Sequence, residues 1–257
     1  MRLLCLGRPV YFGWCDALVT RNVKAVILDL DGTIVPFNLD YRSARAEVID
    51  FLGSQGFPRS LFSLNESVFE MLKKVEVSMK NQNKSDKDFS EVKKAILALL
   101  EKYEMKSASS NNLIPGMAET LRALKKMKLK LALFTVNSEK STNHILDTFH
   151  LRQFFDAVIT RDSVSFVKPN PVHLQMVLKV LKVKPEEVVV VGDSVWDMKS
   201  AQELNVFAVG TLSGVSSAKQ LTQAGANCLI SSPLDLITLI EELNKAQNEK
   251  NKKAIVA

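Results

Sequence analysis

The chain has 257 residues, 46% of them hydrophobic and 24% charged, with a formal net charge of +6. This length and composition are typical of a globular protein with one sizeable core or two smaller ones. No apolar run approaches the roughly 18 residues that a membrane-spanning helix needs, and Gly7-Arg8-Pro9 interrupts the apolar start too early for a secretory signal. We therefore expect a cytoplasmic protein with no membrane contact.

The basic excess lies at the two ends of the chain. Residues 1–24 and 245–257 each carry a net charge of +3, and the residues between them are neutral overall. A nucleic-acid surface should instead form a basic stripe on a folded element, with aromatic side chains among the cations. We expect no nucleic-acid partner, and we interpret the C-terminal residues as a solvated, partly frayed end.

The first expected element is a buried strand that ends in two acids. The stretch Val23–Thr33 reads VKAVILDLDGT, and an apolar run without polar alternation is typical of a strand inside a parallel sheet. Asp29 and Asp31 then lie beyond the carboxyl end of that strand, where such folds hold ligands. Two neighbouring acids repel each other, and a metal ion would offset the repulsion. Taken alone, the same residues also fit a simple turn that closes a strand.

Residues 37–113 show only helical periodicity. Apolar stripes predict helices over Arg42–Gly53, Leu64–Lys80 and Phe89–Tyr103. We interpret this region as an inserted helical domain, with one hinge near Pro36 and the other in the polar stretch 107–112.

From Pro115 onward, helices alternate with short apolar strands. Strands are expected over Leu129–Phe134, Ala157–Thr160, Glu187–Val191, Val206–Val209 and Cys228–Ile230, with a helix between each pair and a last helix over Leu234–Leu243. This alternation is typical of an α/β fold. We expect a Rossmann-like, mainly parallel sheet in a core domain of residues 1–36 and 114–257, with residues 37–113 as the helical insert.

Further polar residues follow the later strands or precede a helix. Thr135 and Asp193 each follow an expected strand, and Lys168 stands between them in the proline-containing stretch VKPNP. A surface position is the ordinary interpretation of a lone lysine, and a threonine is unremarkable at a strand end. The order of these residues along the chain is more informative than any one of them.

Four short motifs carry a family resemblance. They read DLDGTI (29–34), FTVNS (134–138), VKPNP (167–171) and GDSVWD (192–197). In this order they resemble the haloacid dehalogenase superfamily, in its phosphatase branch. The resemblance extends from Val23 to about Leu243 and is closest to the phosphoglycolate phosphatase-like group, in which a helical cap follows the first motif.

The resemblance implies a role for each motif residue. Asp29 would be the nucleophile that forms an aspartyl-phosphate, and Asp31 would be the general acid and base. Thr135 and Lys168 would bind and stabilise the phosphoryl oxygens. Asn137 would bind substrate, although many relatives place asparagine directly after the threonine, where this chain has Val136.

The resemblance also implies a Mg²⁺ cofactor. Its ligands would be the carboxylates of Asp29 and Asp193 and the backbone carbonyl of Asp31, with Asp197 in or near the ligand shell. Mg²⁺ suits such a site, because it prefers oxygen ligands and few protein carboxylates.

We therefore predict a Mg²⁺-dependent phosphatase that hydrolyses a small phosphorylated metabolite through an aspartyl-phosphate. A phosphomutase similar to β-phosphoglucomutase and a binding protein without turnover are the alternatives. The sequence leaves open the substrate, the cap residues that select it, the oligomeric state and the role of residues 1–22.

Overall fold

The computed structural model describes residues 21–256, with side chains as far as Lys245, so the N-terminal stretch of unassigned role lies almost wholly outside the described residues. The chain divides into two compact units. The sheet unit comprises Met1–Phe37 and Asn111–Ala257, and the helical unit comprises Asn38–Ser110. Among the described helices, none combines the length and apolar character needed to cross a bilayer.

The strands are β1 (Ala25–Leu28), β2 (Lys130–Phe134), β3 (Ala157–Ile159), β4 (Val188–Gly192), β5 (Phe207–Thr211) and β6 (Cys228–Ile230). The α-helices are α1 (Tyr41–Ser54), α2 (Val68–Asn81), α3 (Asp86–Ser110), α4 (Met117–Lys126), α5 (Glu139–Thr148), α6 (Pro171–Leu181), α7 (Val195–Glu203), α8 (Ala218–Gln223) and α9 (Asp235–Val256). Short 3-10 helices are η1 (Arg59–Leu61), η2 (Arg152–Phe154), η3 (Arg161–Ser163) and η4 (Pro185–Glu187).

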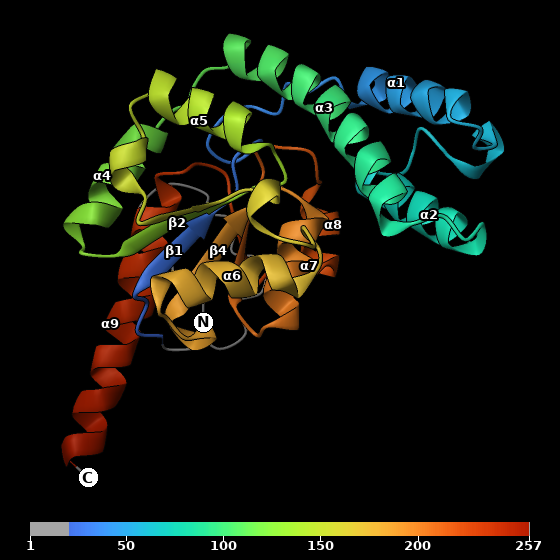
Figure 1. Cartoon of the computed structure of the whole chain (residues 1–257). Coiled ribbons are helices and arrows are strands. Elements are labelled where there is room, and N and C mark those ends of the chain that lie inside the picture. The colour runs from blue at the N-terminus through green and yellow to red at the C-terminus, as the bar shows by residue number, and fades with distance from the viewer. Residues whose placement is uncertain (1–20, 257) are drawn as a thin grey trace. The chain divides into compact units, whose positions relative to one another are not determined.

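In the described part of the sheet unit, six strands form one parallel sheet in the order β3-β2-β1-β4-β5-β6. Figure 1 labels β2, β1 and β4, which are neighbours in this sheet. The predicted α/β fold with a parallel sheet is therefore confirmed. β1 lies at the centre, between β2 and β4. The carboxyl ends of these three strands meet at one edge, so side chains from segments far apart in the sequence come together there.

Helices cover both faces of the sheet. Ala25 and Ile27 of β1 belong to a buried cluster that also contains Leu174 of α6, Met198 of α7 and Leu221 of α8. Because side chains alternate along a strand, the other residues of β1 point to the opposite face, where α4 contacts both β2 and α9. Burial on both faces explains why the strands are apolar without alternation.

The helical unit has its own apolar core. Val48 of α1, Met71 and Val75 of α2 and Ile96 of α3 are completely buried in one cluster. Ser67 begins α2 with a capping box, in which its side chain and that of Glu70 each accept a bond from the other residue's backbone N–H. The three predicted helices of this region are present.

The polar stretch 107–112 begins with the last turn of α3, which continues through Ser110, and the boundary between the two units falls between Ser110 and Asn111. Ser107 is buried, and the hydroxyls of Ser109 and Ser110 donate to carbonyls of the preceding turn, those of Met105 and Lys106. Such bonds satisfy a serine side chain without ending a helix.

The last helix is also longer than predicted, since α9 runs to Val256 rather than ending near Leu243.

Candidate active site

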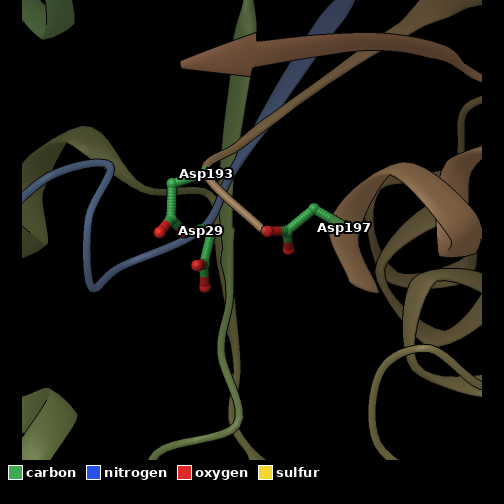
Figure 2. Close-up of side chains that lie close together, drawn as sticks. All are labelled: Asp29, Asp193 and Asp197. Atoms are coloured by element: carbon green, nitrogen blue, oxygen red, sulfur yellow. The ribbon is translucent and has the colours of Figure 1, made fainter. Parts of the chain in front are cut away.

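Two acids lie side by side at the carboxyl edge of the sheet. Leu28 of β1 pairs with Val191 of β4, and the backbone N–H of Asp29 donates to Val191 O over 2.9 Å. Asp29 follows β1 directly and Asp193 follows β4 directly. Figure 2 shows both side chains with Asp197, which comes from the first turn of α7, and carboxylate oxygens of the three lie within 4.8 Å of one another.

Lys168 supplies a buried cation to this acidic cluster. Its Nζ donates to Asp29 Oδ1 over 2.6 Å, to Asp197 Oδ1 over 2.7 Å and to the carbonyl of Phe134 over 3.1 Å. Nζ also lies 4.1 Å from the centroid of the Phe134 ring. Burial alone would lower the pKa of Lys168, but the charges of Asp197 and Asp29 outweigh that effect and raise it. The lysine therefore stays charged.

Asp197 is held on both of its carboxylate oxygens. Oδ1 accepts from Lys168, while Oδ2 accepts from the hydroxyl of Ser194 over 2.6 Å and from its backbone N–H over 3.1 Å. The bond from the Ser194 N–H, together with one from the Asp197 N–H to Ser194 Oγ over 3.4 Å, forms the capping box at the start of α7. Gly192 makes room for the arrangement, since a Cβ at that position would lie 2.3 Å from Asp197 Cγ.

A loop that the sequence analysis missed holds Asp193. After β5, the backbone N–H of Val215 donates to Asp193 Oδ2 over 2.7 Å, and that of Ser216 donates to the Asp193 carbonyl over 3.2 Å. Gly214 lies so close that a Cβ there would be 1.9 Å from Asp193 Oδ2. The available signal was weak: a glycine and serines directly after an expected strand.

Asp31 lies on a tight turn, two residues after Asp29. The backbone turns at Gly32, whose φ is +76°, a conformation that glycine adopts without strain. The side-chain amide of Asn137 donates to Asp31 Oδ2 over 2.6 Å. The hydroxyl of Thr135, which is buried, accepts from the backbone N–H of Asn137 over 3.2 Å. The Asn137 side chain therefore contacts the Asp31 carboxylate, although Val136 separates Asn137 from Thr135 in the sequence.

A family model matches the part of the chain that contains these site residues. The sequence model of the haloacid dehalogenase-like hydrolases matches residues 23–205. This chain belongs to that family. The predicted family is confirmed, and so is the predicted class of enzyme, a hydrolase whose relatives bear phosphatase names.

Curated relatives match over nearly their whole lengths. A phosphoglycolate phosphatase of Nitrosospira multiformis is 24% identical over 86% of this chain and 96% of its own length. The pyrophosphatase PpaX of Bacillus mycoides is 26% identical over 87% of this chain and 99% of its own. Among solved structures, a hydrolase from Pseudomonas syringae is similar with a TM-score of 0.63 and 24% identity, over 85% of this chain and 98% of that one.

In this haloacid dehalogenase-like hydrolase, three buried carboxylates lie close together, and the Lys168 ammonium contacts two of them, Asp29 and Asp197. Burial, then the charges of Asp29 and Asp197, raise the pKa of Asp193 to about 8. Burial raises the pKa of Asp29 to about 6, with Lys168 opposing that rise and Asp197 adding to it. The protein's own cations within this cluster do not balance its acids. A divalent cation would, so the residues present fit a metal ion with oxygen ligands.

Proposed function

We propose that this chain is a Mg²⁺-dependent phosphatase that hydrolyses a small phosphorylated metabolite through an aspartyl-phosphate on Asp29. The observation that carries the proposal is the position of Asp29 at the strand end, next to Asp193 on one side and the Lys168 ammonium on the other. A carboxylate at this position can act as a nucleophile. The neighbouring ammonium can stabilise the negative charge of a phosphoryl group that binds there.

The proposed reaction has two displacements. Asp29 attacks phosphorus, the bond from phosphorus to the leaving oxygen breaks, and Asp31 gives that oxygen its proton. Asp31 then takes a proton from a water molecule, which attacks phosphorus and releases Asp29 and inorganic phosphate. The bond from the Asn137 amide to Oδ2 orients the Asp31 carboxyl group that exchanges the proton.

Lys168 and Thr135 would stabilise the phosphoryl oxygens. Lys168 is anchored by Asp197 and the Phe134 carbonyl as well as by Asp29, so the ammonium keeps two protein partners when Asp29 turns to phosphorus. The Thr135 hydroxyl accepts a bond from the Asn137 backbone, and its own hydrogen can be donated to the substrate. Both groups are in place before substrate arrives, so little reorganisation accompanies the reaction.

The Mg²⁺ ion would be held by the carboxylates of Asp29 and Asp193 and the backbone carbonyl of Asp31. We place Asp197 beside these ligands, because its two oxygens already accept bonds from Lys168 and Ser194. When bound, the ion would neutralise negative charge that gathers on the phosphoryl group. In this proposal Asp29, Asp31 and Asp193 are metal ligands, as the resemblance implies, and Asp197 lies near the ligand shell, where it binds Lys168.

The substrate class is proposed from the relatives and from the helical unit. One relative is named for phosphoglycolate and another for pyrophosphate, so both small phosphate esters and small anhydrides are candidates. The helical unit, Asn38–Ser110, would serve as a cap that excludes water and large substrates during the reaction. Small substrates are therefore expected over phosphoproteins.

A turnover screen tests the proposal. Purified protein with Mg²⁺ is offered phosphoglycolate, sugar phosphates, pyrophosphate and a phosphopeptide, and the release of inorganic phosphate is measured. Release from a small substrate that EDTA abolishes is the expected result. Isomerised sugar phosphate without phosphate release would show the phosphomutase instead. Absence of turnover on every compound, with folding confirmed, would overturn the proposal in favour of a binding protein.

A further inference from the structure

His173 lies directly behind the lysine that faces the site. It is the third residue of α6 and is completely buried. Its Nδ1 lies 3.4 Å from the backbone nitrogen of Lys168, and its Nε2 lies 3.3 Å from the carbonyl oxygen of Ile159, the last residue of β3. The imidazole thus connects the end of a strand to the lysine loop.

These two contacts select one form of the ring. The backbone nitrogen of Lys168 can only donate, so Nδ1 must be an unprotonated acceptor. The Ile159 carbonyl can only accept, so Nε2 must carry the hydrogen. A neutral imidazole with its hydrogen on Nε2 satisfies both partners, whereas a charged ring would lose the bond to Lys168.

The surroundings keep the ring neutral. Burial, and then the positive charge of Lys168, lower the pKa of His173 to about 4. The ring also packs edge-on against Phe134, with centroids 5.6 Å apart and an interplanar angle of 64°. Phe134 contacts Lys168 as well, through its ring and its carbonyl. His173, Phe134 and Lys168 therefore form one packed group behind Asp29.

We propose that His173 is a positioning residue that holds the Lys168 backbone so that the ammonium points at Asp29 and at the phosphoryl group of the substrate. The role of Lys168 in this statement rests on the proposed function. The ring itself touches neither Asp29 nor the reacting atoms. The ring acts by orienting the Lys168 side chain. The Nζ atom of that side chain donates to acceptors on three separate segments.

A matched pair of variants separates positioning from packing. In His173→Asn the Oδ1 atom can accept from Lys168 as Nδ1 does, and in His173→Gln the Nε2 atom can donate to Ile159 but nothing replaces Nδ1. We expect His173→Gln to lose about tenfold in kcat/KM, the value of one hydrogen bond of roughly 1.4 kcal/mol, and His173→Asn to lose much less. The loss should appear mainly in kcat, with a matching weakening of inhibition by inorganic phosphate.

Thermal unfolding of both variants serves as the control for stability. Equal losses of kcat/KM in the two variants, or losses that follow the unfolding temperature rather than the Nδ1 acceptor, would show that His173 only packs. His173→Leu, which keeps bulk without either polar atom, should lose at least as much activity as His173→Gln.

A second measurement does not need turnover. The chain has three histidines, so ¹⁵N-histidine labelling gives few signals, and the His173→Asn spectrum assigns the one that disappears. We expect ring nitrogen shifts of a neutral imidazole protonated on Nε2, unchanged from pH 5 to pH 8. A ring protonated on Nδ1, or one that titrates in this range, overturns the inference. If the wild type releases no phosphate from any compound, the proposed function fails while this result still stands or falls by itself.

Discussion

Lys168 and Asp197 form a buried ion pair next to Asp29. Without Lys168, the carboxylates of Asp29 and Asp197 would be buried with no cation between them. Without Asp197, the ammonium would lose a partner 2.7 Å away. Removal of one partner of a buried pair leaves an uncompensated charge and costs several kcal/mol. We therefore interpret this pair as the support on which Asp29 depends.

The nucleophile is tested by Asp29→Asn. The amide keeps the shape of the side chain but cannot form an aspartyl-phosphate, so phosphate release from a small ester should fall to background. Asp147→Asn is the matched control, because Asp147 is an exposed acid on α5. Phosphate release is measured for both variants alongside circular dichroism. Substantial turnover by folded Asp29→Asn would rule out Asp29 as the nucleophile.

The general acid is tested by Asp31→Asn with two leaving groups. Loss of general acid catalysis typically costs on the order of 10²–10⁴-fold, and we expect a loss of this size for a sugar phosphate. p-Nitrophenol needs little protonation to leave, so the burst of p-nitrophenol in the first step should suffer much less. Rapid-mixing measurement of that burst decides the point. Equal losses for the two substrates would mean that Asp31 is not the acid.

At the scale of elements, the loop after β5 orients a candidate metal ligand. Ser213 Oγ donates to the Gly32 carbonyl over 2.6 Å, and Val215 donates to Asp193 Oδ2. The loop therefore ties the turn after β1 to the acid after β4. Sheet strands bring the two acids to one edge, but this loop decides where one of them points.

Gly214→Ala should disturb that orientation. The new Cβ would lie 1.9 Å from Asp193 Oδ2, so the acid or the loop must move. We expect at least tenfold weaker Mg²⁺ binding, measured by calorimetry, with a smaller change in unfolding temperature. Ser216→Ala is the control in the same loop, since Ser216 contacts Asp193 through its backbone. Unchanged Mg²⁺ affinity in Gly214→Ala would show that the loop does not set the ligand geometry.

At the scale of the whole molecule, the acidic cluster should make stability depend on pH. Asp193 has a folded pKa of about 8 against an ordinary value of 3.8. The folded protein therefore binds this proton more tightly than the unfolded chain, and the resulting stability is present in acid and lost as pH rises from about 4 through about 8. In EDTA the unfolding temperature should fall between pH 5 and pH 8.5.

Mg²⁺ should reverse that loss, and most strongly at the high end of the pH range, where the acids are ionised and can bind it. Calorimetric unfolding with EDTA and with Mg²⁺ measures the difference. Asp193→Asn removes one of the two carboxyls with a raised pKa, the other being Asp29, and should reduce both responses. A Mg²⁺ effect of equal size in Asp193→Asn and wild type would place the ion elsewhere.

Removal of the helical unit tests whether it selects the substrate. Ile114 N donates to Ile34 O over 2.9 Å, so the chain leaves and re-enters the sheet unit at neighbouring points and a short Gly/Ser linker can join Phe37 to Asn111. Each unit has its own apolar cluster, so the remaining sheet unit should fold and keep its stabilisation by Mg²⁺. Turnover should then broaden toward bulky esters. An unchanged substrate ranking in a folded variant would mean that the sheet unit selects the substrate.

Local patterns account for what the sequence predicted. The apolar strands, the helical stripes of both units and the acids that follow β1 and β4 are all readable from neighbouring residues, because strand and helix periodicity depend on short range in the chain. The order of four short motifs then indicated the family. Where local signals conflicted with burial, as at Ser107, the helix is longer than predicted, since α3 runs to Ser110 rather than ending at Tyr103.

Contacts between distant residues decided the rest. Lys168 lies 139 residues from Asp29 and the Asn137 amide lies 106 from Asp31, and no spacing rule relates such pairs. The anchoring of Asp197, the approach of Gly214 to Asp193 and the contact of His173 with the lysine backbone depend on how strands from separate segments pair and how α6 and α7 pack on them. The order of residues along the chain establishes which chemical groups follow the strands. Which of those groups touch depends on the folded molecule, because burial and hydrogen bonding act between segments that the chain order keeps apart.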